Sequence, residues 1–220
     1  MTYNVNRSSN TPIIALDLDG VCSKTRYGFI KEISNIYNLN ISKDRLYNRR
    51  LKIPQISENY SEAVLKIINS DPSVYSRMNP IKGSALASRT LNRSYKIKIV
   101  SNRFSKEWLD PETRQEVFEH TRKWLDSNDF SYDEVVNPIE GDKSDIPADV
   151  FIDDTPEVIR SIDDEVLKIT YIRPHNINHI PYNCWNAAKY DDKRAEDLVQ
   201  NPQKQWSLIT EYLRDYSTKL

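Results

Sequence analysis

Three short apolar runs, each ending in polar residues, constrain the fold of this chain more than any other feature. The runs and their polar ends are residues 13–16 before Asp17-Leu18-Asp19-Gly20, residues 95–100 before Ser101-Asn102-Arg103, and residues 150–152 before Asp153-Asp154. Short apolar runs with polar boundaries are typical of strands buried in a parallel sheet. We therefore expect parallel strands whose carboxyl ends carry polar side chains.

Helical periodicity fills much of the sequence between these runs. Apolar residues recur at helical spacing over about residues 28–78, with Ser42 and Ser61 as candidate N-caps. Further helices are expected at about 83–93, 111–127 and 154–162, further strands at about 132–136 and 166–172, and a closing helix in the tail at 184–216. This order predicts an α/β fold: a Rossmann-like parallel sheet with helices on both faces and a small helical cap inserted after the first strand.

The length of 220 residues predicts one domain with an insert. Residues 1–11 are expected to form a flexible lead, because they are polar and lack apolar periodicity. Residues 12–22 and 80–220 would form the core with a C-terminal helix. Residues 23–79 would form the helical cap insert.

Composition excludes several classes of protein. The chain has 31 basic and 32 acidic residues, and this near-neutral charge argues against a dedicated nucleic-acid wrapper. Its two cysteines, Cys22 and Cys184, exclude a disulfide scaffold and a four-thiolate zinc site. The sequence shows no signal-peptide core and no apolar run of membrane-spanning length, so we expect a cytoplasmic protein without a membrane partner.

The polar strand ends indicate a metal-assisted site. Ligands of open α/β sheets bind beyond the carboxyl ends of the strands, where these side chains would meet. Clustered carboxylates repel one another unless a cation lies between them, and oxygen ligands favour Mg²⁺. Lys143 precedes the strand at 150–152 and can reach the same edge from a loop.

These residue types suit phosphoryl chemistry. With a metal and Lys143 neutralising an incoming phosphate dianion, Asp17 can attack phosphorus as a nucleophile. Asp19 can protonate the leaving oxygen and later deprotonate the hydrolytic water. Ser101 and Lys143 can hold the remaining phosphate oxygens, and Gly20 allows the chain to turn sharply behind the site.

The same motifs resemble those of the haloacid dehalogenase superfamily of phosphohydrolases. Its four motifs correspond to residues 16–21 (LDLDGV), residues 99–103 (IVSNR), Lys143 and residues 150–157 (VFIDDTPE). Within the superfamily, the cap position and the DLDGV and FIDDTPE sequences are similar to the 5′(3′)-deoxyribonucleotidase group. The resemblance implies a Mg²⁺-dependent phosphatase that hydrolyses a phosphate monoester, in particular a nucleoside monophosphate, through an aspartyl-phosphate.

The resemblance also assigns the site residues. Asp17 is implied as the nucleophile and Asp19 as the general acid and base. Ser101, Asn102 and Lys143 are implied to bind the phosphoryl group. Magnesium is implied to bind the Asp17 carboxylate, the Asp19 backbone carbonyl and Asp154, with Asp153 assisting either through these ligands or through water.

Two other functions remain open from the sequence. A phosphatase acting on DNA or RNA ends would use the basic residues of the cap insert, Lys43, Arg45, Arg49, Arg50 and Lys52, as a strand-binding surface, although such residues also suit a solvated helix face. A non-catalytic phosphate-binding or interaction module would keep the fold without the reaction. Oligomeric state is not determined by the sequence.

A few other side chains have both a functional and a structural interpretation. Tyr27 could stack on a substrate base, whereas Phe29 is expected in the core. Arg103 could contact substrate or cap a helix. His175 and His179 have the i, i+4 spacing of zinc ligands near Cys184, but the surrounding Asn and Pro residues disfavour the helix that this spacing needs.

Overall fold

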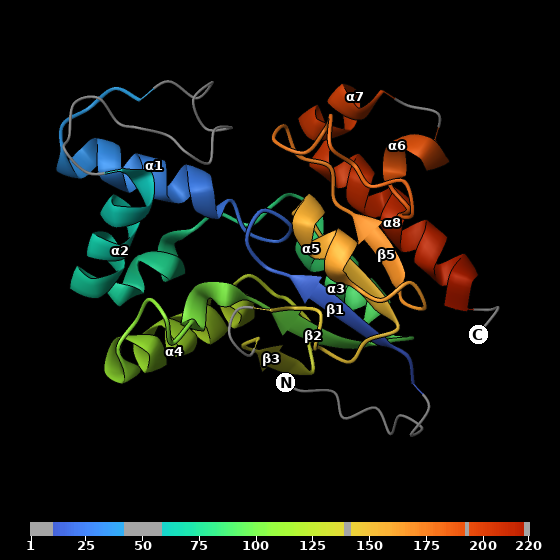
Figure 1. The fold of residues 1–220 in the computed structure, drawn as a ribbon, viewed down its shortest axis with the longest axis horizontal. Coiled ribbons are helices and arrows are strands. Elements are labelled where there is room, and N and C mark those ends of the chain that lie inside the picture. Colours follow the sequence, from blue (N-terminus) through green and yellow to red (C-terminus); the bar gives the residue numbers. More distant parts are fainter. Residues whose placement is uncertain (1–10, 42–58, 139–141, 192–193, 218–220) are drawn as a thin grey trace.

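The computed structural model describes residues 11–41, 59–138, 142–191 and 194–217. Its centre is a five-stranded, all-parallel sheet in the order β3-β2-β1-β4-β5 (Figure 1). The strands are β1 (Ile13–Asp17), β2 (Lys96–Val100), β3 (Glu134–Val136), β4 (Val150–Asp153) and β5 (Leu167–Thr170). The fold is therefore the expected parallel α/β fold, with β1 in the middle of the sheet.

Helices connect the strands in the predicted order. They are α1 (Thr25–Ile36), α2 (Tyr60–Ser70), the 3-10 helix η2 (Pro72–Arg77), α3 (Ser84–Leu91), the 3-10 turn η3 (Asn102–Phe104), α4 (Pro111–Ser127), α5 (Pro156–Ser161), α6 (Ala187–Tyr190), α7 (Ala195–Gln200) and α8 (Pro202–Ser217). Helix α4 has the bounds that the sequence predicts. Asp110 caps it by accepting hydrogen bonds from the amides of Glu112 and Thr113, and Pro111 occupies its first turn.

Both faces of the sheet are covered, because alternate side chains of each strand enter different clusters. Ile14 and Leu16 of β1 pack in the larger cluster with Trp124 of α4 and Trp206 of α8. Ala15 points to the other face, where it packs with Phe151, Val100 and Ile162, beside α5. The sheet therefore lies between helical layers, as the period-two pattern requires.

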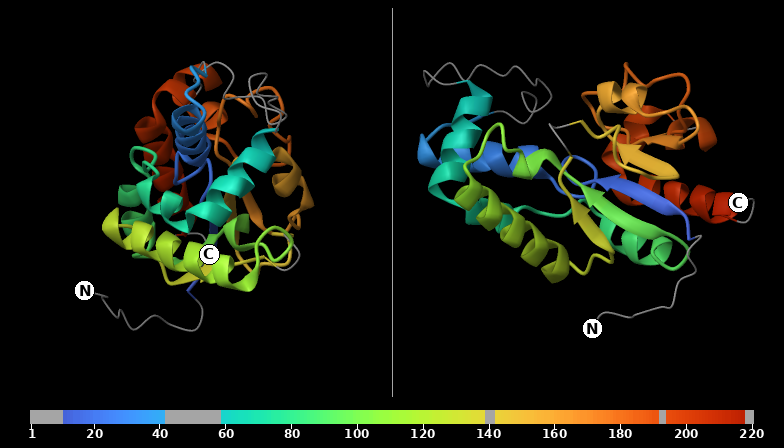
Figure 2. Two further views of the ribbon diagram at one scale, coloured as in Figure 1. Left: turned by 90° about the vertical axis from the view of Figure 1, so that its left-hand side faces the viewer. Right: turned by 60° about the horizontal axis from the view of Figure 1, so that its bottom comes forward.

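The helices between β1 and α3 have a separate hydrophobic cluster, which they share with α4. Phe29 and Ile33 of α1, Ile67 of α2 and Tyr75 of η2 are buried in it. Figure 2 shows α1 and α2 lying beyond the carboxyl end of the sheet, beside α4. These helices therefore cover the edge at which β1 ends.

The α1 helix approaches η2 closely at Gly28. A Cβ atom built on Gly28 would lie 1.9 Å from the Sδ atom of Met78, which follows η2. The indole nitrogen of Trp124 in α4 donates a hydrogen bond to the Met78 carbonyl at 2.6 Å. Met78 therefore contacts both α1 and α4.

Two sequence predictions in the helical regions were wrong. Ser61 is not the N-cap of α2. The N-cap is Asn59, which forms a capping box with Glu62, so the helix starts at Tyr60. The tail is not one closing helix: α8 is preceded by the short helices α6 and α7. Asn186 caps α6 by accepting from the Lys189 amide, which starts this short helix before the turn at Asp191.

Some predictions fall on residues outside the described part of the chain. These are most of the expected flexible lead, the helix expected after Ser42, and the basic residues Lys43, Arg45, Arg49, Arg50 and Lys52. Among the described residues, no helix is long and apolar enough to cross a membrane.

Candidate active site

The carboxyl ends of the three central strands bring the predicted site residues together. Asp17 ends β1 and Asp153 ends the neighbouring strand β4. Ser101 follows β2, on the other side of β1. Parallel pairing in register places these residues at one edge of the sheet, where α/β proteins bind ligands.

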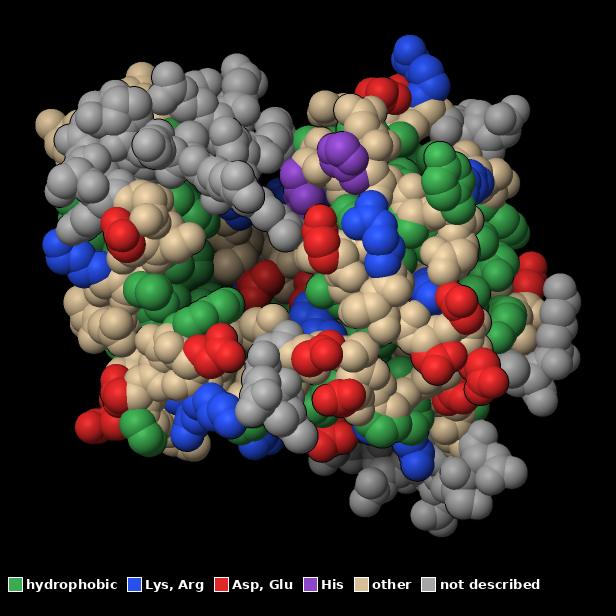
Figure 3. All heavy atoms as spheres, in the orientation of Figure 1, with side chains coloured by type: hydrophobic (Ala, Val, Ile, Leu, Met, Phe, Trp, Pro, Cys, Tyr) green, Lys and Arg blue, Asp and Glu red, His purple; other side chains and the backbone are tan. Residues whose placement is uncertain are grey.

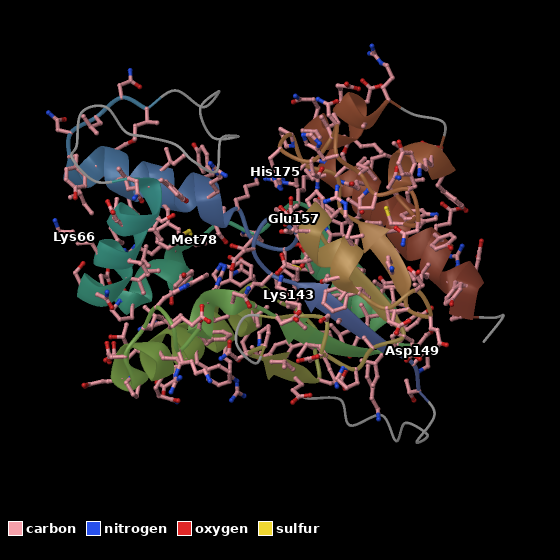
Figure 4. The ribbon with its side chains drawn as sticks, in the orientation of Figure 1. Lys66, Met78, Lys143, Asp149, Glu157 and His175 are labelled. Carbon is pink, nitrogen blue, oxygen red and sulfur yellow. The ribbon has the colours of Figure 1, made fainter. Side chains whose placement is uncertain are left out.

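Lys143 bridges the two strand-end carboxylates. Its Nζ atom lies 2.5 Å from Asp17 Oδ1 and 2.7 Å from Asp153 Oδ2, and all three residues are buried. Figure 4 shows Lys143 near the end of β1, at the centre of the molecule. Burial opposes the charge of Lys143, but the charges of Asp153 and Asp17 and their hydrogen bonds raise its pKa above the usual value, which keeps the ammonium protonated.

The pKa of Asp17 moves in the opposite direction to that of an exposed carboxyl in an ion pair. Burial raises it well above its ordinary value, and the charges of Asp153, Asp154 and Asp19 raise it further, while Lys143 lowers it. An additional cation beside Asp17 would stabilise its ionised form. The site therefore holds more negative charge than Lys143 compensates.

Asp17, Asp153 and Asp154 form a potential metal site. Each of these buried residues offers a carboxylate oxygen, and the offered atoms lie within 4.8 Å of one another. No other such group of histidine, cysteine or acidic residues occurs in the described parts of the chain. Both carboxylate oxygens of Asp153 accept a hydrogen bond at 2.7 Å, Oδ2 from Lys143 and Oδ1 from the Thr155 amide.

Gly20 makes room for Asp154. It has a left-handed φ of +90°, and a Cβ atom there would lie 2.2 Å from Asp154 Oδ2. Only glycine combines this backbone conformation with such a close carboxylate. A cluster of oxygen donors against a bare backbone suits a small hard divalent cation, so these residues fit the metal that the sequence implies.

Asp19 points to a different partner, Arg103. The Arg103 Nε atom lies 2.9 Å and 3.0 Å from the two carboxylate oxygens of Asp19, and its Nη2 atom lies 2.5 Å from Oδ1. Thr25, the first residue of α1, donates a short hydrogen bond to the same carboxylate, and Ser101 Oγ donates to it at 3.2 Å. Asp19 is thus held on the side of the site that faces α1.

The Arg103 contact determines the ionisation of Asp19. Burial alone would raise its pKa, but the charge of Arg103 and the hydrogen bonds from Arg103 and Thr25 lower it below the ordinary value. Asp19 is therefore ionised here. From the sequence, Arg103 was expected either to contact substrate or to cap a helix. Neither expectation included this buried ion pair.

Residues after β5 also reach the site, which was not expected from the sequence. His175 Nε2 lies 3.3 Å from Asp154 Oδ2, and Asn176 Nδ2 donates to the Asp154 carbonyl at 2.6 Å. Figure 4 shows His175 in the loop above α5. Their position after a strand of the same sheet was the available signal. It was missed because His175 and His179 were considered only as zinc ligands, a role that the surrounding Asn and Pro residues disfavour.

That zinc site is not formed. His175 faces Asp154, and the Cys184 Sγ atom is instead 3.0 Å from Thr170 Oγ1 and donates to the Pro181 carbonyl. Cys22 lies buried beside the site, and burial raises its thiol pKa well above the usual value, which disfavours a thiolate nucleophile.

A cavity of about 550 Å³ opens over these residues. Its floor includes Asp17, Asp19, Asp154 and Lys143, and Figure 3 shows acidic side chains in the hollow between the two lobes of the molecule. An adjoining cavity of about 400 Å³ shares Asp19, Tyr60, Val64 and Asn102 with it. Its wall consists mainly of apolar and aromatic residues of α2 and of the segment before α4.

The other residues singled out from the sequence occupy distinct places. Asn102 lines both cavities. Tyr27 lines the larger cavity and is 39 % exposed, whereas Phe29 contributes to its wall but is buried in the core, as expected. All the predicted site residues therefore lie at or around one cavity.

The family comparison decides the class of the protein. The model of the family 5′ nucleotidase, deoxy (Pyrimidine), cytosolic type C protein matches residues 11–203. The chain belongs to this family. It is therefore a phosphatase of the haloacid dehalogenase superfamily, and its acidic cluster agrees with the divalent metal that this superfamily generally uses.

Three of the similar solved structures share between 10% and 17% sequence identity with this chain. One is the haloacid dehalogenase-like hydrolase SP0104 from Streptococcus pneumoniae, with 14% identity over 74% of this chain and 85% of that chain and a TM-score of 0.47. Another is the HAD-superfamily hydrolase GSU2069 from Geobacter sulfurreducens, with 17% identity over 76% and 91% and a TM-score of 0.45. A third is the putative HAD-hydrolase YfnB from Bacillus subtilis bound to magnesium, with 10% identity over 78% and 92% and a TM-score of 0.46. No curated protein matches this chain in sequence.

Proposed function

We propose that this protein hydrolyses a nucleoside monophosphate, with Mg²⁺ as its metal and an aspartyl-phosphate intermediate. The observation that carries this proposal is the buried group of Asp17, Asp153, Asp154 and Lys143 at the floor of the cavity. Family membership supports the nucleotide as the substrate.

Asp17, Asp154 and the backbone carbonyl of Asp19 would hold the metal. When bound, Mg²⁺ supplies positive charge that polarises the phosphoryl group and stabilises the transition state. The donor set supports this assignment, because oxygen ligands from one or two carboxylates suit Mg²⁺ together with substrate oxygens. Asp153 orients the site through its contacts with Lys143 and the Thr155 amide.

Asp17 attacks the phosphorus atom, and the bond from phosphorus to the nucleoside oxygen breaks. Lys143 and Ser101 bind the phosphoryl oxygens while the phosphoryl group is transferred. The leaving oxygen takes a proton from Asp19. Water then attacks the aspartyl-phosphate, Asp19 accepts its proton, and inorganic phosphate leaves with Asp17 restored.

The ionised state of Asp19 suits the second of these steps. A carboxylate paired with Arg103 can accept a proton from water, whereas a proton donor must first be protonated. We infer that Asp19 leaves Arg103 before it acts as the acid. Thr25, which binds the same carboxylate, is the first residue of α1, so movement of that helix would be coupled to this change.

The test is phosphate release from a panel of phosphate monoesters, with Mg²⁺ and with a chelator. The panel contains deoxyribo- and ribonucleoside 5′-monophosphates, sugar phosphates and phosphorylated oligonucleotides. Selective Mg²⁺-dependent release from mononucleotides is expected. Release from oligonucleotides alone would assign the protein to nucleic-acid ends, and metal-independent release would contradict the proposed mechanism.

A further inference from the structure

Asn176, in the loop after β5, is completely buried, and each polar atom of its side chain binds the backbone. Its Nδ2 atom donates to the Asp154 carbonyl at 2.6 Å and to the Tyr171 carbonyl at 2.9 Å. Its Oδ1 atom accepts from the Arg173 amide at 2.8 Å. An amide side chain has two N–H donors and a carbonyl acceptor, so all of its polar groups have partners. Asn176 therefore joins the loop after β5 to the residue that follows β4.

The peptide group between Asp154 and Thr155 is held at both ends. Its carbonyl oxygen accepts the hydrogen bond from Asn176, and its N–H donates to Asp153 Oδ1 at 2.7 Å. A peptide group is planar, so two such bonds fix its orientation. The Asp154 Cα atom lies in the same plane, so the backbone from which the Asp154 carboxylate extends is fixed as well.

His175 contacts the same residue at longer distances. Its Nε2 atom lies 3.2 Å from the Asp154 carbonyl oxygen and 3.3 Å from Oδ2, and its side chain is 16 % exposed. The bond from Asn176 is shorter and is buried. Hydrogen bonds are electrostatically stronger away from water, so Asn176 gives the peptide group more support than His175 does.

The carboxylate of Asp154 has little room to move. A Cβ atom on Gly20 would lie 2.2 Å from its Oδ2 atom, so the carboxylate lies directly against that backbone. It also belongs to the three buried carboxylates of the potential metal site. A small displacement of its backbone would move it into Gly20 or away from the other two carboxylates. Mg²⁺ demands near-octahedral geometry, so such a displacement would weaken its binding.

We propose that Asn176 is a positioning residue that holds Asp154 in place as a ligand of the metal. This inference rests on the proposed function, because it requires the metal assigned there. Residues that hold a ligand without touching the metal typically contribute roughly 10–100-fold to metal affinity. Loss of Asn176 should therefore weaken Mg²⁺ binding and leave the chemical steps of the loaded enzyme unchanged.

The experiment is calorimetric titration of the substrate-free protein with Mg²⁺, in wild type and in Asn176→Ala. We expect the Kd for Mg²⁺ to rise about tenfold or more in the variant. Gln205→Ala is the matched control, because Gln205 is also a buried amide that holds the loop after β5. It donates to the Ile172 carbonyl at 3.1 Å and accepts from the Ile172 amide at 2.7 Å, rather than binding Asp154. The control should lose stability and keep the wild-type Kd.

The Mg²⁺ dependence of phosphate release separates positioning from a purely structural role. In Asn176→Ala, the Mg²⁺ concentration that gives half-maximal release should rise by the same factor as the Kd. The kcat at saturating Mg²⁺ should stay within about twofold of wild type, because the loss is one of binding. Near-UV circular dichroism checks that each variant is folded. If Asn176→Ala does not fold, Asn176→Ser takes its place, since its hydroxyl is one atom shorter than the amide.

A raised Kd in the Asn176 variant alone supports the positioning role, even if no phosphate monoester of the panel is hydrolysed. An unchanged Kd overturns it, as does an equal rise in Gln205→Ala, which would indicate a general effect of loosening the loop. If neither Asn176 variant folds, the residue is structural and the assignment falls. Wild-type protein that binds no Mg²⁺ would instead reject the metal of the proposed function, and the positioning role with it.

Discussion

The guanidinium of Arg103 holds the carboxylate of Asp19, with Nε at 2.9 Å and 3.0 Å from its two oxygens. The arginine side chain is only 1 % exposed. Its Cζ atom lies 4.3 Å from the centre of the Tyr75 ring in η2, and its Nη2 atom donates to Thr25 of α1 at 2.9 Å. One buried cation therefore connects the strand-end site with two helices of the insert between β1 and α3.

Replacing Arg103 with Met should lower the free energy of unfolding by about 3 kcal/mol at pH 7, because it leaves Asp19 without its counter-charge. Urea denaturation measures this change. Arg89→Met is the control, since Arg89 and its partner Asp129 are 39 % and 80 % exposed and such a pair contributes less than about 1 kcal/mol. Equal losses in the two variants would show that the buried Arg103 pair contributes no more to the free energy of unfolding than the exposed Arg89 pair.

The same pair predicts how stability depends on pH. Arg103 lowers the pKa of Asp19 in the folded protein, so the ionised carboxylate stabilises the fold above the unfolded pKa, near about 4. This contribution is lost as pH falls from that value through the folded pKa. The stability difference between wild type and Arg103→Met should therefore shrink below about pH 4. A difference that stays constant down to pH 2.5 would contradict the assignment.

Gly20→Ala should weaken Mg²⁺ binding by about tenfold or more, because its Cβ atom would displace the Asp154 carboxylate from the metal site. Calorimetric titration with Mg²⁺ measures this effect. Gly83→Ala is a matched control: Gly83 has a similar φ of +94°, but its nearest contact would be Gln203, at 3.1 Å, outside the site. Both variants should lose about 1 kcal/mol of stability from backbone strain, and only Gly20→Ala should lose metal affinity.

Lys143→Met should destabilise the protein by about 3–5 kcal/mol at pH 7, because Asp17 and Asp153 would remain buried without a cation. Burial raises the pKa of Asp17, and the variant removes the charge that opposes this, so the folded variant should bind protons more readily than the unfolded chain. Its stability should therefore rise between pH 7 and pH 5. Denaturation at both pH values measures this trend.

Lys168→Met is the control for the lysine substitution. Lys168 is also buried, but its partner Asp164 is 85 % exposed and stays hydrated without it. The expected cost is less than about 1 kcal/mol, with no gain in stability on acidification. If Lys143→Met behaved in the same way, the strand-end carboxylates would not depend on Lys143.

The sequence predicted the sheet and the residues at its carboxyl edge because both follow from local patterns. An apolar run such as residues 13–16 can be read from neighbouring residues, and a parallel sheet then brings Asp17, Ser101 and Asp153 together. Lys143 required more, because a loop lysine has no periodicity. Its position shortly before the strand at 150–152 and the resemblance to known motifs together indicated it, and its contacts with Asp17 and Asp153 agree with that placement.

The missed contacts are those that depend on tertiary packing. Arg103 and Asp19 are far apart in the sequence, and their pairing requires η3 to turn back toward β1. Asn176 reaches the Asp154 carbonyl only because the loop after β5 folds over the strand ends. The N-cap at Asn59 was missed for a local reason: the neighbouring serine also suited that position, and the reciprocal bonds of Glu62 decide between them.

Asp17→Asn should lower phosphate release by about a thousandfold or more, because an amide cannot act as the nucleophile. The fold should persist, because Lys143 keeps its contact with Asp153. The neutral asparagine also avoids the cost of burying a charge, which disfavours ionised Asp17. The free energy of unfolding should therefore stay equal or rise. Asp145→Asn, at an exposed position near Lys143, is the control and should leave both quantities unchanged. Full activity in Asp17→Asn would assign the nucleophile to another group, whereas lost activity together with a large loss of stability would make the residue structural.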